Sequence, residues 1–201
     1  MTSLLSNYKN SKLLVVSKNR SREDIERLMI DGANLFGENR VQEAKSKFTS
    51  ELYEKYNYEL HLIGPLQSNK TEDALKIFDT IQTIDRRKLV DTISKLKNKI
   101  QFKTKSFYIQ INIGEEEQKS GIKLKELNNL YNYSLEKNLN IVGLMCIPPL
   151  NSDVNFYFNK MLETKDKLNN KLLLSMGMSD DYETALKCGS NMIRIGSKIF
   201  K

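Results

Sequence analysis

A lysine that follows a short apolar run is the first residue of this sequence that could do covalent chemistry. Residues 13–16 are consecutive apolar residues, and Ser17 and Lys18 follow them. A continuous run of this kind predicts a buried strand of a parallel sheet, here over residues 13–18. Active sites of parallel barrels lie at the carboxyl ends of the strands. We therefore expect Lys18 to hold a partly desolvated, nucleophilic amine at a pocket mouth; the alternative is a lysine that points into water.

Polar residues end several other predicted strands. The second strand ends in Glu38 and Asn39, the third carries His61, the seventh ends in residues 175–180, and the eighth ends in Arg194, Ile195, Gly196 and Ser197. Each has a simpler structural alternative. Asn39 could cap a helix, His61 could be a hydrogen-bonded core histidine, and the Gly196–Ser197 pair could be a plain turn. Together, however, these residues would line a single cup.

The last two strands carry the features of a phosphate site. In parallel barrels a phosphate often binds the loops after strands seven and eight. Gly196 lacks a Cβ, so its backbone can approach a phosphate closely, and Ser175 and Ser197 could donate hydroxyl hydrogen bonds. Arg194 is two positions from Gly196 and shares its strand face. Closure of a barrel would place strand eight beside strand one, and thus this site beside Lys18.

Strands and helices alternate along the whole chain. We predict strands over residues 13–18, 35–39, 61–64, 80–85, 106–113, 141–147, 172–179 and 192–197. Helical patterns separate them, the first with Ser21 as N-cap and Gly32 as its stop. Alternation of this kind predicts a parallel sheet, and eight units predict one closed (β/α)8 TIM barrel over residues 1–201. An open doubly wound sheet is the alternative, but no G-x-G-x-x-G follows the first strand.

Composition narrows the class of protein further. The 201 residues are 39% hydrophobic and 28% charged, which is typical of a globular domain, and we expect no membrane span and a cytoplasmic protein. Cys146 and Cys188 lack disulfide-framework or metal-ligand spacing. The net charge of +7 permits nucleic-acid binding, but the lysines are scattered, so we expect no nucleic-acid partner.

Several specific strings follow one another in order from Leu13 to Phe200. They are LLVVSK, FGENRVQEA, LHLIGPLQSNK, TIDR, QINI followed by KSGI, GLMCIP, LSMGMSDD and IRIGSKIF. In content and order these strings resemble those of the pyridoxal-phosphate homeostasis protein family. Two of the long strings, LHLIGPLQSNK and LSMGMSDD, are too specific for chance agreement.

This resemblance implies a barrel of the alanine racemase N-terminal-domain type that binds pyridoxal 5'-phosphate (PLP). Lys18 would hold PLP as a Schiff base, and Lys119 would be a second lysine near the site. The remaining implied contacts are a phosphate site of Ser175, Arg194, Gly196 and Ser197, with Asn39, His61 and Met176 lining the pocket. Such proteins buffer or deliver PLP in vitamin B6 homeostasis, and recipients would be apo forms of PLP-dependent enzymes.

A small PLP-dependent racemase or lyase is the alternative function. Racemases of this fold take a second acid/base residue from an additional β-domain, for which this chain has no residues. If Arg194 lies beside the pyridine nitrogen, it disfavours ring protonation and weakens the cofactor as an electron sink. Both points favour a carrier without catalytic activity.

The resemblance also implies that the N-terminal helix is shortened, to about residues 2–12. We expect this to leave the outward faces of Leu14, Val16 and Ile193 or Ile195 thinly covered where strands one and eight meet. The seam could then mediate weak dimerisation, or Leu4, Leu5 and Phe200 could fold inward over it. A monomer is favoured over a weak homodimer.

Overall fold

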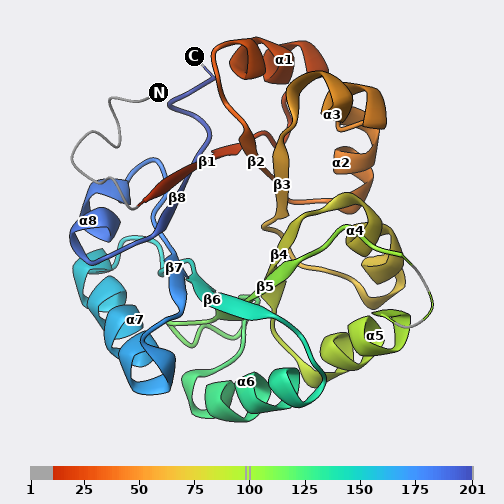
Figure 1. Ribbon diagram of the computed structural model, residues 1–201. Helices are drawn as coiled ribbons and strands as arrows, with labels where there is room; N and C mark the ends of the chain where they lie inside the picture. Colours follow the sequence, from red (N-terminus) through yellow and green to blue (C-terminus); the bar gives the residue numbers. More distant parts are fainter. Residues whose placement is uncertain (1–10, 98, 100, 201) are drawn as a thin grey trace.

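Eight parallel strands form a closed barrel, in the same order as they occur in the chain (Figure 1). The computed structural model describes residues 11–97, 99 and 101–200. Pairing of β1 with β8, in which Leu14 lies opposite Arg194, closes the ring. The predicted fold is therefore confirmed. The strands are β1 (Lys12–Val16), β2 (Leu35–Glu38), β3 (Glu59–Leu62), β4 (Thr80–Ile84), β5 (Ser106–Ile111), β6 (Ile141–Cys146), β7 (Leu173–Ser175) and β8 (Met192–Ile195).

Helices surround the barrel and cover the outer faces of the strands (Figure 1). The helix α1 begins as predicted, since Ser21 and Asp24 form a reciprocal capping box. Two short 3-10 turns, η2 (Ser68–Lys70) and η3 (Leu124–Glu126), precede helices α4 and α6. The α-helices are α1 (Arg22–Ile30), α2 (Val41–Lys47), α3 (Ser50–Tyr56), α4 (Thr71–Ile77), α5 (Arg87–Lys97), α6 (Leu127–Glu136), α7 (Val154–Asn169) and α8 (Tyr182–Lys187).

All eight strands end earlier than the sequence pattern predicts. The strand β1, for example, ends at Val16, so Ser17 and Lys18 lie beyond it, and β7 ends at Ser175. Pairing does not stop abruptly at these ends, since the Ser17 amide still donates to the Gly37 carbonyl at 3.0 Å. Among the described helices, none has the length and apolar character needed to cross a membrane.

The seam between β1 and β8 differs from the expectation. Leu14 packs with Leu35 and Met192 of the adjacent strands, so it faces the barrel interior, together with Val16, and not the outside. Alternate strand residues point to opposite faces, which places Leu13 and Val15 outward instead. The prediction for Leu14 and Val16 was therefore wrong.

The outer side of the same seam is well covered. Ile193 and Ile195 are fully buried against Leu186 of α8, so the expected thin cover is also wrong. Phe200 packs against the main core, in line with the inward-folding alternative, and the Arg20 guanidinium lies over its ring. Leu4 and Leu5, with most of the expected helix over 2–12, lie outside the described residues. Within that range, Lys12 already belongs to β1.

Candidate functional site

Lys18 lies in a turn at the carboxyl end of β1. Its side chain is exposed, while its neighbour Ser17 is fully buried. Asn19 has a left-handed backbone with φ 58°, a conformation that asparagine tolerates better than most residues. Because the strand ends before Lys18, burial does not desolvate its amine, and that part of the expectation was wrong. Lys18 is open to a ligand that enters the mouth.

A partly buried ionic cluster holds the main chain on both sides of Lys18. The Lys47 ammonium, on α2, donates to the Ser17 carbonyl at 2.9 Å and to Oε1 of Glu38 at 3.1 Å. It also donates to Oε1 of Glu43, which accepts the Asn19 amide as well. The Ser17 hydroxyl donates to Oε1 of Glu38 at 2.8 Å. We call this set, Ser17, Asn19, Glu38, Glu43 and Lys47, the clamp.

The two clamp carboxyls differ in their protonation behaviour. Burial raises the pKa of Glu38, although hydrogen bonds from Ser17 and Lys47 oppose this. Its second oxygen, Oε2, is buried with no partner among the described residues. Burial would raise the pKa of Glu43 too, but hydrogen bonds from Lys47 and the Asn19 amide outweigh it and lower that pKa. Lys47 therefore supplies the positive charge that offsets the cost of placing these two carboxyl groups close together.

Arg194 crosses the interior of the barrel at the same end. It is 3% exposed, and burial lowers the pKa of its guanidinium. Nη1 donates to the Ser175 carbonyl at 2.7 Å and to the Ser175 hydroxyl at 2.9 Å, while Nη2 donates to the Cys146 carbonyl at 2.9 Å. These bonds tie β8 to β7 and β6 and fix the plane of a buried cation. Burial raises the pKa of the Cys146 thiol to about 12.

The end of β8 lies tightly against the end of β1. A Cβ added at Gly196 would lie 3.1 Å from the Val16 carbonyl oxygen and 3.3 Å from the Val16 Cβ. Glycine at this position therefore lets the loop after β8 approach the Lys18 turn. Ser197 is exposed, and its hydroxyl hydrogen-bonds that of Ser179 at 3.1 Å.

Five of the candidate residues come together at this mouth. Since β1 lies between β2 and β8, Lys18 has Asn39 after β2 on one side and the end of β8 on the other. The residues that gather there are Lys18, Asn39, Arg194, Gly196 and Ser197, with Ser175 below Arg194. The Asn39 backbone packs so closely on Gly64 that a Cβ there would lie 2.2 Å from the Asn39 carbonyl oxygen.

Three candidates lie elsewhere. The Met176 side chain is fully buried in the main core, because it points to the face opposite Ser175. His61 fills the barrel interior, where it contacts Glu59 and Gln82. Lys119 follows β5, which lies across the ring from β1, and its amine binds Glu116 and the Pro148 carbonyl. Met176 and His61 therefore do not line the mouth, and Lys119 lies at the carboxyl end of the barrel but across the ring from Lys18.

Sequence reasoning missed three polar residues near the mouth. Lys47 has no distinctive spacing from Glu38, so only the tertiary structure reveals the clamp. Gln82 and Gln110 could have been found, because polar residues two apart on a barrel strand, such as Thr80 and Gln82, mark its interior face. Gln110 is 7% exposed, and its Oε1 is buried with no partner among the described residues. No group of three metal ligands occurs within the described part of the chain.

A lysine after the first strand and a buried arginine in the last are set here in a barrel of the alanine racemase type. The alanine racemase of Acinetobacter baumannii superposes with a TM-score of 0.76 over 98% of this chain and 58% of the racemase, at 15% identity, which shows the fold. The chain belongs to the pyridoxal phosphate homeostasis protein family. The member from Haemophilus influenzae is 41% identical over 96% of this chain and 86% of its own length.

Further relatives agree with this assignment. The pyridoxal phosphate homeostasis protein of Aquifex aeolicus is 38% identical over 94% of this chain and 86% of its own. PipY of Synechococcus elongatus, in a structure with PLP bound, has a TM-score of 0.87 and 30% identity, and the match covers 100% of this chain and 97% of PipY. No family model matches the sequence.

Proposed function

We propose that the chain binds PLP at the carboxyl mouth of the barrel and buffers or delivers it in vitamin B6 homeostasis. The observation that supports this proposal is the junction of β1 and β8, where an exposed lysine follows β1, and β8 carries a buried arginine and is followed by a glycine that allows close backbone approach. The PLP-bound relative of the same fold supports it. The barrel acts as one domain in the cytoplasm, and recipients are apo PLP-dependent enzymes.

The residues present fit this cofactor. PLP supplies an aldehyde and a phosphate. Lys18 would supply the amine that condenses with the aldehyde, with loss of water. Backbone N–H groups after β8 and the Ser197 hydroxyl would hold the phosphate, and Arg194 would supply a buried cation within the barrel. The unpartnered Gln110 Oε1, across the barrel, is a buried acceptor that a ligand donor could satisfy.

We further propose that the protein is a carrier and not an enzyme. Arg194 stays charged and would disfavour protonation of a pyridine nitrogen beside it, which weakens the cofactor as an electron sink. The alternative, a racemase or lyase, would use the same cofactor in the same barrel. We infer that the protein acts as a monomer, since Ile193 and Ile195 at the seam are already covered.

The test combines binding with turnover. Purified full-length protein should take up about one PLP per chain, with a shift of the cofactor absorption that borohydride abolishes. It should racemise or deaminate no common amino acid at the rates of roughly 1–1000 per second typical of enzymes. Failure to retain PLP would refute the binding role. Turnover in the enzymatic range would establish the racemase or lyase alternative.

Substitutions at Gly196 and Ser197 test where the phosphate binds. A Gly196→Val side chain would press on Val16 and separate the two strand ends, so PLP affinity should fall about tenfold or more, with a stability loss of about 1–3 kcal/mol. Ser197→Ala removes one exposed hydroxyl and should cost on the order of 1 kcal/mol of binding. Equilibrium dialysis measures both. Equal and negligible effects would contradict this placement.

A further inference from the structure

A chain of hydrogen-bonded polar side chains, buried except at one end, runs through the barrel interior, where branched apolar residues are the rule. His61 on β3 contacts Oε1 of Glu59 through Nε2 at 2.7 Å, and Nδ1 of His61 contacts the Gln82 amide nitrogen at 2.7 Å. The Ser175 hydroxyl donates to Oε1 of Gln82 at 2.6 Å, and Arg194 donates to the Ser175 oxygen at 2.9 Å. We call these five residues the interior chain.

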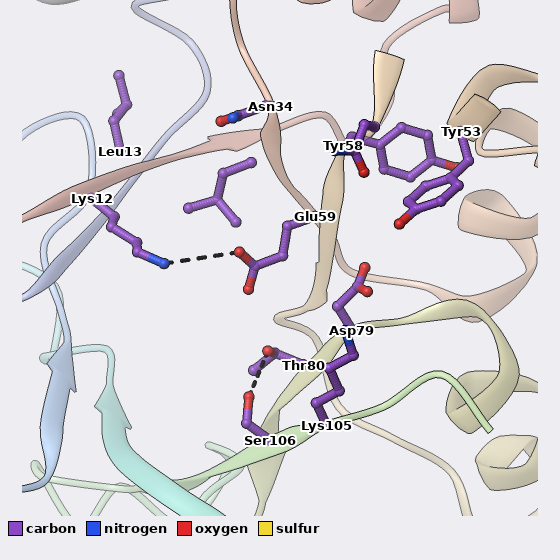
Figure 2. A pocket seen from close by; sticks show the side chains of 12 residues that line it. Lys12, Leu13, Asn34, Tyr53, Tyr58, Glu59, Asp79, Thr80, Lys105 and Ser106 are labelled. Carbon is purple, nitrogen blue, oxygen red and sulfur yellow. Dashed lines mark hydrogen bonds and ion pairs between the residues drawn. The ribbon is translucent and has the colours of Figure 1, made fainter. Parts of the chain in front are cut away.

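The interior chain spans the barrel from end to end. Arg194 lies at the carboxyl mouth, whereas Glu59 faces a cavity of about 660 Å³ at the amino end, shown in Figure 2. There the Glu59 carboxylate lies 3.9 Å from the Lys12 ammonium, and Thr80 and Ser106 share a hydrogen bond of 2.8 Å. One end of the chain is therefore a half-exposed carboxylate, and the other is a buried cation at the candidate site.

The hydrogen bonds of the interior chain have one consistent direction while His61 is neutral. Arginine cannot accept, so Arg194 donates to Ser175, and Ser175 gives its single hydroxyl proton to Oε1 of Gln82. The Gln82 amide nitrogen then donates to Nδ1 of His61.

Nδ1 of His61 therefore carries no proton, and Nε2–H donates to Glu59. That bond is the main reason why the pKa of Glu59 lies below its usual value. Reversing the Gln82 amide would require a proton on Nδ1 of His61 and, to keep the contact with Glu59, a further proton on either Nε2 or the Glu59 carboxyl.

We propose that Gln82 and His61 are positioning residues for the PLP site, a role that rests on the proposed function. His61 fixes the orientation of the Gln82 amide, and Oε1 of Gln82 accepts the only hydroxyl proton of Ser175. The Ser175 oxygen is then left with lone pairs that accept a hydrogen bond from Arg194 and hold it in place. The hydroxyl donor to the phosphate is then Ser197 and not Ser175. His61, expected from the resemblance to line the pocket, acts instead from inside the barrel through Gln82.

The direction of the chain can be tested without the cofactor. His61 is the only histidine in the sequence, so nitrogen NMR of ¹⁵N-histidine-labelled full-length protein reports on this ring alone. We expect Nδ1 of His61 to be unprotonated and Nε2 to be protonated. The addition of PLP should leave this tautomer unchanged. Gln82→Glu replaces the donor to His61 by an acceptor, so both ring nitrogens should then be protonated. A purely structural glutamine would not produce that change.

The positioning role is tested by PLP affinity in three variants. Gln82→Met removes the hydrogen bonds of Gln82 with Ser175 and His61. PLP binding should weaken about tenfold, because the Ser175 hydroxyl, and with it Arg194, is no longer held in position. Gln82→Glu still accepts from Ser175 and should bind within about threefold of wild type. The matched control is Thr83→Val on the same strand, since the buried Thr83 hydroxyl has no partner among the described residues and its loss should leave affinity unchanged.

Three results would overturn the inference. They are a proton on Nδ1 in the wild-type protein, protonation of Nδ1 when PLP binds, or wild-type affinity in Gln82→Met. A wild-type protein that retains no PLP would refute the proposed function, and the NMR result would still decide the direction of the chain. The two failures are thus distinguishable.

Discussion

Lys47→Met should lower the free energy of unfolding by about 3 kcal/mol or more at neutral pH, although Lys47 is not among the residues proposed to bind the ligand. The substitution leaves Glu38 fully buried and Glu43 nearby without their shared cation. It also strips the Ser17 carbonyl of a hydrogen bond next to Lys18. Urea denaturation measures the loss. The control is Lys76→Met, which breaks an exposed pair with Glu72 and should cost less than about 0.5 kcal/mol.

The defect of Lys47→Met should shrink in acid. Without Lys47, burial raises the pKa of Glu38 in the folded state still further above its unfolded value. The folded protein then binds the proton more tightly than the unfolded chain, so the penalty is present above the folded pKa. It is relieved as pH falls through that pKa towards the unfolded value near 4.3. A loss in stability that is independent of pH would show that packing, and not charge, explains the effect.

The barrel could be predicted because its signals are local and repeated. Each strand is a short apolar run, and each is followed by a helical pattern, so the order of elements fixed the topology. The helix α3 at Ser50–Tyr56 was not predicted, because residues 49–60 are rich in charge and tyrosine and continue directly from the preceding helix. Strand ends were placed too late because polar residues at the mouth follow the apolar run without a break.

The site was predictable to the level of strand ends but not of side-chain direction. A resemblance supplies positions, and the two-residue period of a strand then decides which of them face the mouth. The prediction for Met176 was wrong for this reason: Ser175 points into the barrel, so the adjacent Met176 points outward into the main core. His61 shares the inward face, but it lies on β3 before the strand end, so it reaches the mouth through Gln82. The clamp could not be foreseen, because Lys47 meets Ser17 across thirty positions of sequence.

The largest expected functional effect comes from Lys18. In Lys18→Ala the covalent attachment of PLP should be lost, so borohydride treatment should leave less than about a tenth of the wild-type label on the protein. The side chain is exposed, and stability should therefore change by no more than about 0.5 kcal/mol. If the label is lost while the unfolding midpoint is unchanged, the loss is due to the missing amine and not to a folding defect.

The matched control is Lys119→Ala. Lys119 also lies in a loop at the carboxyl end of the barrel, but its amine is engaged by Glu116 and the Pro148 carbonyl, across the ring from β1. Its loss should leave most of the label, and peptide mapping of the wild-type protein should find the pyridoxyl group on the peptide that contains Lys18. If the label instead follows Lys119, then the junction of β1 and β8 is not the attachment site. The clamp, Gly196 and Arg194 would then need another ligand to explain why they converge there.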